Sequence, residues 1–196
     1  MASIQKRIDY KLLDTNVPAM TDTSITYLDS YINKSHVIFE WGSGASTFWF
    51  AERCNTIWSV EYFKSFFEEL QIRAQDKINI NLILKEPDET KHPGYIAKHS
   101  SASGKSFKDF VHSIDKFKDN YFDIIVIDGR VRNRCLDLAI PKLKSRGMIV
   151  YDDTNRDAYF DHIVPVAEKY FEGIMQFPGV TIDNKRSTTS ILYKKK

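Results

Sequence analysis

The chain has little of what marks secreted or membrane proteins. It holds only two cysteines, Cys54 and Cys135, in no CxxC or metal-ligand spacing, which excludes a disulfide framework and favours a reducing compartment where both thiols pack as small hydrophobic groups. No apolar run approaches the ~20 residues of a membrane helix, and no basic-then-apolar leader opens the chain. We therefore expect a soluble, cytoplasmic protein that makes no membrane contact.

The chain also lacks an excess of charge of either sign. Its 28 basic and 26 acidic side chains are interspersed and leave a net charge of +2, so no broad basic surface for a nucleic-acid partner is predicted. With 196 residues, 42% of them hydrophobic, the chain has the size of one domain, 1–196, in which 1–35 forms an N-terminal lead-in segment. The oligomeric state does not follow from the sequence.

Apolar periodicity predicts strands that alternate with helices. This order is typical of an α/β fold, a doubly wound and mostly parallel sheet with helices on both faces, joined by right-handed crossovers. Strands are predicted at 36–39, 56–60, 78–84, 121–127, 147–151 and 190–193, and helices at 24–32, 47–54, 63–70, 107–117, 136–143 and 164–171, the last with Pro165 in its first turn.

A long polar connection, 85–105, separates the third strand from the next helix. It holds two prolines, two glycines and a serine cluster, so it is either a lid over a binding site or a disordered segment. Its end, Gly104-Lys105-Ser106, is similar to the end of a phosphate-binding loop. His99 stands where that loop needs its first glycine, and no strand leads in, so we exclude this reading.

The sequence Glu40-Trp41-Gly42-Ser43-Gly44 follows the first strand and opens a helix for which Ser46 is the predicted cap. Glycines let the backbone approach a ligand closely. A second acid, Glu61, ends the next strand about 20 residues on, the spacing of a ribose-binding carboxylate. A carboxylate at Glu40 needs a partner, which is either a cationic ligand group or a nearby Arg or Lys.

This stretch resembles motif I of the class I S-adenosylmethionine-dependent methyltransferases, and Ser59-Val60-Glu61-Tyr62 resembles the acidic end of their second strand. The resemblance covers nearly the whole chain and implies a Rossmann-like, seven-stranded sheet with an antiparallel last strand. In that family the glycine loop lies against the methionine part of the cofactor, and the acid binds the ribose. No residue of 85–105 matches the adenine contact. The cofactor-binding residues implied here are Glu40, Gly42, Ser43, Gly44, Ser46, Glu61, Tyr62 and Asp128.

A nicotinamide dinucleotide site is an alternative reading of the same glycines. It is disfavoured because Thr47 stands where a third glycine or alanine is expected, and because the charged Glu40 is unusual for that fingerprint. A further alternative is a module that binds S-adenosylmethionine, or another partner, without catalysis.

Oxygen ligands gather after the fourth and fifth strands. Asp128, Asp152 and Asp153 are candidate Mg²⁺ ligands, and the pattern resembles the metal site of catechol-type O-methyltransferases, except that Asp153 stands where their asparagine would be. Without a metal, Asp128 would contact cofactor or substrate and Asp152 would act as a base.

The resemblance implies methyl transfer from S-adenosylmethionine to a small-molecule substrate, namely a hydroxyl of a sugar or another polar metabolite. Candidate catalytic residues are Asp152, His162 and Asp128, with His99 as a further possible base. The acceptor site would be built from the lead-in segment, 85–105 and 155–161. Three arginines after the fourth strand either meet an acidic substrate group or form the exposed, charged start of a helix; they are Arg130, Arg132 and Arg134.

Overall fold

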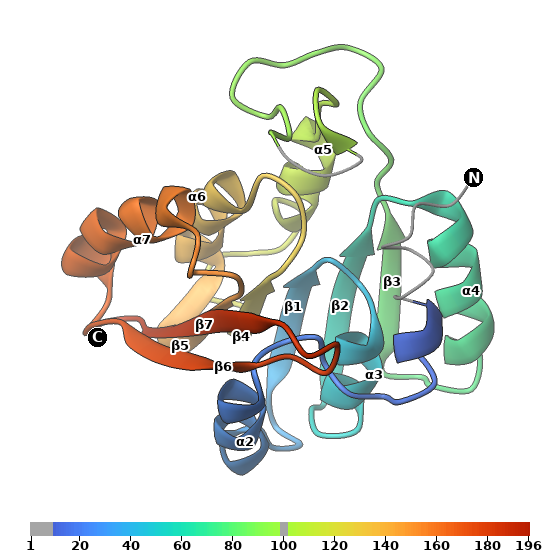
Figure 1. The fold of residues 1–196 in the computed structure, drawn as a ribbon, viewed down its shortest axis with the longest axis horizontal. Helices are drawn as coiled ribbons and strands as arrows, with labels where there is room; N and C mark the ends of the chain where they lie inside the picture. The colour runs from blue at the N-terminus through green and yellow to red at the C-terminus, as the bar shows by residue number, and fades with distance from the viewer. Residues whose placement is uncertain (1–9, 99–101) are drawn as a thin grey trace.

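A seven-stranded sheet forms the centre of the computed structural model, which describes residues 10–98 and 102–196 (Figure 1). Its strand order is β3-β2-β1-β4-β5-β7-β6. The first five strands are parallel, whereas β7 runs antiparallel to both β5 and β6. The predicted α/β fold with an antiparallel last strand is therefore confirmed. The strands are β1 (Val37–Trp41), β2 (Thr56–Glu61), β3 (Ile80–Leu84), β4 (Phe122–Ile127), β5 (Leu143–Tyr151), β6 (Met175–Val180) and β7 (Arg186–Tyr193).

Helices cover both faces because each central strand is apolar on both sides. In β1, Ile38 packs with α2 and α3, whereas Phe39 and Trp41 pack in the cluster that holds α5, α6 and α7. A third cluster joins α3 to α4 through Phe48 and Phe66. The helices are α2 (Asp22–Tyr31), α3 (Ala45–Ala51), α4 (Lys64–Ala74), α5 (Lys108–Val111), the 3₁₀ turn η2 (His112–Ile114), α6 (Arg132–Lys142) and α7 (Asp157–Tyr170).

Three local predictions about helices were wrong. The helix expected at 107–117 ends at Val111 and continues as a 3₁₀ turn, where the Ser113 hydroxyl donates to the Phe110 carbonyl at 2.7 Å and competes with the helical backbone. Helix α7 begins at Asp157, so Pro165 lies in its middle and not in its first turn. The carbonyl that loses its donor belongs to the exposed Asp161, on the solvent side. The third is Ser46, since the N-cap of α3 is Gly44.

Both cysteines are buried and free, as predicted. Burial raises the pKa of the Cys54 thiol to about 11, which keeps that sulfur protonated and unreactive at neutral pH. Within residues 10–98 and 102–196, no helix has the length and apolar character needed to cross a bilayer.

The connection after β3 is tied down at Asp88. Its carboxylate accepts hydrogen bonds from the Ser106 hydroxyl at 2.6 Å and from the backbone N–H groups of Lys108 and Asp109 at 2.6 and 3.1 Å. These bonds satisfy the free N–H groups at the start of α5. The two ends of the long loop are thereby fixed against each other. His99 lies outside the described residues.

Candidate cofactor and acceptor cleft

A cleft of about 1370 Å³ opens beyond the carboxyl ends of the parallel strands. It lies where the strand order reverses at β1 and β4, the place where open α/β sheets bind ligands. Its volume exceeds the ~300–1,000 Å³ of a pocket for one small molecule. Three segments expected to build the acceptor site contribute to the lining, namely the lead-in segment (Leu12, Ala19), the long loop (Gly94, Ile96, Ala97, Lys98) and the stretch after β5 (Asn155, Arg156, Asp157, Ala158, Tyr159).

The glycine loop after β1 is pressed against the end of β4. Gly42 has a φ of +100°, and a Cβ on it would lie 2.9 Å from the backbone carbon of Asp128 and the nitrogen of Gly129. The N–H groups of Gly42 and Ser43 both donate to the Val60 carbonyl, at 2.9 and 3.2 Å. Only glycine fits this position, and the loop is consequently fixed to both neighbouring strands.

Glu40 lies beneath this loop and is fully buried. Its carboxylate accepts hydrogen bonds from the hydroxyls of Ser46, Thr47 and Ser59, each at 2.5 Å. Ser59 is the residue of β2 in register with Glu40. Among the described residues the partners of Glu40 are thus hydroxyls, and the Arg or Lys that was one of the two alternatives is not found there. Glu40 shapes the floor of the loop, whereas Ser43, Gly44 and Ser46 reach the cleft lining.

Burial raises the pKa of Glu40 to about 7, although the three hydroxyl bonds act in the opposite direction. Its ordinary value is 4.5, so between these values the folded chain binds more protons at this site than the unfolded chain. The free energy of unfolding therefore falls as the pH rises through this interval.

We predict that Glu40→Gln removes most of this pH dependence, because an amide has no proton to lose. The difference between wild type and variant should change by on the order of 3 kcal/mol from pH about 4.5 to pH about 7.5. Urea unfolding at a series of pH values measures it, with Glu68→Gln on the exposed side of α4 as the control. An unchanged slope in Glu40→Gln would contradict the assignment.

Glu61 closes β2 and lies on the cleft lining with 2% of its surface exposed. Its Oε1 accepts the Phe63 N–H at 2.7 Å, which fixes the side chain at the start of α4. Tyr62, also on the lining, accepts a hydrogen bond from Arg130 Nη2 at 2.7 Å, and this guanidinium lies 4.9 Å from the centre of the Tyr62 ring. The loop and the second acid thus share one cleft.

The carboxylates after β4 and β5 also meet there. One oxygen from each of Asp128, Asp152 and Asp153 lies within 4.8 Å of the others. The Asp152 side chain is almost fully buried and accepts the Thr189 hydroxyl at 2.7 Å. Burial, together with the neighbouring Asp153, raises the pKa of Asp152 to about 6. The structure therefore brings together the three acids named from the sequence.

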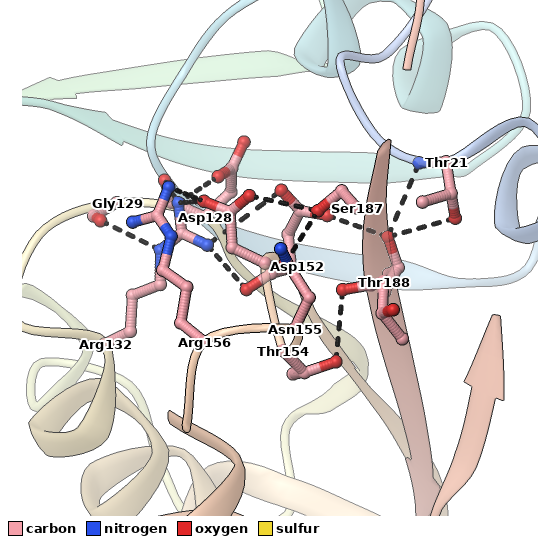
Figure 2. A network of polar contacts seen from close by, with 12 residues as sticks. Thr21, Asp128, Gly129, Arg132, Asp152, Thr154, Asn155, Arg156, Ser187 and Thr188 are labelled. Carbon is pink, nitrogen blue, oxygen red and sulfur yellow. Dashed lines mark hydrogen bonds and ion pairs between the residues drawn. The ribbon is translucent and has the colours of Figure 1, made fainter. Parts of the chain in front are cut away.

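Arg132 enters this cluster, and its role was missed in the sequence (Figure 2). Only 6% of its surface is exposed, so the expectation of an exposed helix start was wrong for this residue. Its Nη2 lies 2.6 Å from Asp128 Oδ1 and 3.1 Å from Asp153 Oδ2, and its Nη1 donates to the Asp152 carbonyl at 2.5 Å. The signal available in the sequence was that Asp128, Arg132, Asp152 and Asp153 all lie close to the ends of two strands.

The donor set does not fit a divalent metal ion as it stands. The carboxylates that would bind Mg²⁺ already contact a buried guanidinium, and a second cation there would repel it at short range. Asp153 is also paired with Arg156 at 2.8 Å.

Two other candidate side chains, a predicted base and an arginine, lie farther along α6 and α7. His162, on α7, lines the cleft, and its Nε2 lies 3.0 Å from Asp137 Oδ1 on α6. Arg134 is half exposed and also pairs with Asp137, at 3.3 Å.

No family model matches the chain, and no curated protein matches it. Solved structures do share its fold. A proposed O-methyltransferase from Klebsiella pneumoniae has a TM-score of 0.67 and 14% identity, over 100% of this chain and 91% of that one. A proposed methyltransferase from Streptococcus mutans in complex with SAH has a TM-score of 0.59 and 10% identity, over 87% and 95%. An rRNA methylase from Streptococcus thermophilus has a TM-score of 0.61 and 12% identity, over 88% and 95%. The chain therefore has the Rossmann-like methyltransferase fold.

Proposed function

We propose that this protein transfers the methyl group of S-adenosylmethionine to a hydroxyl oxygen of a small polar acceptor. The observation that carries the proposal is that the glycine loop, Glu61 and the carboxylates after β5 line one continuous cleft. The Streptococcus mutans structure, which has the same fold, contains SAH, the product that S-adenosylmethionine leaves after methyl transfer.

The residues fit such a cofactor. In the Gly42–Gly44 loop the two glycines offer backbone without a side chain to the methionine part, and Glu61 offers a carboxylate to the ribose hydroxyls. Ser43, Ser46, Tyr62 and Asp128 complete the binding surface along the lining. The cofactor supplies an electrophilic methyl group, and the protein contributes positioning of the acceptor oxygen and removal of its proton.

Asp152 is the proposed base. With a pKa of about 6, its carboxylate is largely ionised at pH 7.5 and can accept a proton from an acceptor hydroxyl. The Thr189 hydroxyl donates to Oδ1. The second oxygen, Oδ2, lies 3.9 Å from Arg132 Nη1, which is beyond hydrogen-bond distance, so it can still accept a proton. His162 is the alternative base. The variants Asp152→Asn and His162→Gln should distinguish the two, because the variant that lacks the base should lose methyl transfer while it still binds S-adenosylmethionine.

A small acceptor is favoured by the cleft, which the long loop and the stretch after β5 border on two sides. The guanidinium of Arg130 has Tyr62 as its polar partner and no carboxylate within ion-pair distance among residues 10–98 and 102–196. An acidic group on the acceptor, such as a carboxylate or phosphate, would supply one. RNA is the alternative acceptor class with which small acceptors must be compared, because the rRNA methylase has the same fold.

Calorimetry with S-adenosylmethionine, followed by transfer of a labelled methyl group, tests the proposal. We expect saturable binding, and labelling of hydroxylated metabolites such as sugar acids and sugar phosphates in preference to total RNA. Absence of binding at about millimolar cofactor would refute the proposal, and binding without transfer to either acceptor class would favour a non-catalytic module. A change in reduced-nicotinamide fluorescence would instead indicate a dehydrogenase.

A further inference from the structure

We infer that Arg132 is a built-in cation that takes the place of a divalent metal ion in the acceptor site, and that removal of its guanidinium uncovers a site for such an ion. The contacts between Arg132 and the three carboxylates are independent of the proposed function, whereas the role of this cluster toward an acceptor rests on it. In that setting the acceptor oxygen is positioned and deprotonated by side chains without coordination to a metal.

The spacing of the carboxylates suits a single ion. Oxygens from Asp128, Asp152 and Asp153 all lie within 4.8 Å of one another. Oxygen ligands of divalent ions lie at about 2.0–2.6 Å from the metal, so two ligands of one ion are separated by at most about 5 Å. The acids come from the ends of two adjacent parallel strands, β4 and β5, whose register fixes Ile127 against Tyr151 just before them.

The guanidinium of Arg132 lies against all three of these carboxylates. Its Nη2 contacts Asp128 and Asp153, and its Nη1 lies 3.9 Å from Asp152 Oδ2. The remaining donors are used on backbone, since Nε donates to the Gly129 carbonyl at 3.2 Å and Nη2 also donates to the Asp128 carbonyl at 3.1 Å. The hydrogen bonds of Arg132 thus go to the aspartates and to Gly129, and it acts as a positioning residue for the carboxylates (Figure 2).

The location of Arg132 is otherwise unfavourable for a cation. It is the first residue of α6, where the helix dipole opposes positive charge, and it is almost fully buried. Burial lowers the pKa of Arg132, but the carboxylates of Asp128, Asp153 and Asp152 outweigh it and hold the pKa above its ordinary value. The guanidinium is thus charged at every physiological pH, and the acids are what keep it there.

The backbone at Val131 and at Asp153 indicates that the arginine and the carboxylates around it are held in one arrangement. Val131, which precedes Arg132, has a φ of +53°, and Asp153 has a φ of +61°. Left-handed backbone is strongly disfavoured for a β-branched residue and persists only where the surroundings determine it. Val131 directly precedes the arginine, and Asp153 carries one of the carboxylates that contact its guanidinium.

The test uses Mn²⁺ as the probe, followed by electron paramagnetic resonance and by thermal unfolding of the full chain. Wild type is expected to bind no Mn²⁺ at this site and to show no shift in Tm. Arg132→Ala should unfold at a lower temperature, bind one Mn²⁺ per chain and recover Tm when the ion is added. Arg134→Ala, on the same helix, is the control and should behave as wild type, while the double variant Arg132→Ala with Asp153→Asn should lose the acquired ion.

Two results would overturn the inference. One is a single Mn²⁺ bound by wild type and lost in Asp153→Asn, which would make this a metal site. The other is an Arg132→Ala chain that neither binds Mn²⁺ nor regains structure with it, whether or not it folds alone. Neither readout requires methyl transfer, so failure of the proposed function, seen as absence of S-adenosylmethionine binding to wild type, is recognised separately.

Discussion

Replacement of Gly42 by alanine is expected to abolish measurable S-adenosylmethionine binding and to lower the free energy of unfolding by about 3 kcal/mol. The backbone conformation at φ +100° disfavours any side chain, at a cost of about 1–3 kcal/mol. The new Cβ would also lie 2.9 Å from backbone atoms of Asp128 and Gly129, and such overpacking costs a further ~1–3 kcal/mol. The loop can relieve the contact only by moving away from β4, into the cleft.

Gly44→Ala is the matched control for this experiment. It lies two residues on in the same loop, its φ of −178° is extended backbone, and a Cβ there would meet no atom within 4 Å. Its unfolding free energy should change by less than about 1 kcal/mol, the range for exchange at an N-cap. Urea unfolding and calorimetry measure both variants. Equal stabilities for the two would show that the contact between Gly42 and β4 does not hold the loop.

Glu61→Ala is expected to weaken S-adenosylmethionine binding by about 100- to 10,000-fold with little change in fold. Hydrogen bonds to a charged group contribute about 1.5–3 kcal/mol each, and the ribose offers two hydroxyl donors to this carboxylate. Glu61→Gln should fall in between, since an amide keeps one acceptor oxygen without the charge.

Calorimetry with S-adenosylmethionine measures this loss, and circular dichroism checks the fold of each variant. Glu52→Ala, whose side chain is half exposed at the end of α3, is the control and should bind as wild type does. Wild-type affinity in Glu61→Ala would remove the ribose assignment and would place the cofactor elsewhere in the cleft.

Part of this site was predictable because its determinants are local. A continuous apolar run such as Ile124–Ile127 indicates a strand buried on both faces, and the residues at its end must reach the carboxyl edge of the sheet. The parallel topology then brings Glu61, Asp128 and Asp152 to one rim without any further information. The need for glycine at Gly42 likewise follows from a sharp turn between strand and helix.

Other features required the tertiary structure. Glu40 was assigned a charged partner because a buried carboxylate needs one, but three hydroxyls satisfy it, and one of them, on Ser59, comes from the neighbouring strand. A serine in the middle of a strand has no local signal that distinguishes it from an ordinary small residue. Helix lengths also differed, since the Ser113 hydroxyl competes with the helical backbone after α5 and since α7 begins at Asp157, well before the expected start.

The sequence by itself determined the fold class and the edge of the sheet that carries the cleft, because apolar periodicity and the alternation of strands with helices are properties of the chain. Only the tertiary structure decided that Arg132 turns inward. Periodicity places an arginine at a helix start on the surface, whereas its actual position depends on the field of three carboxylates from two strand ends, and that field exists only once the strands are side by side.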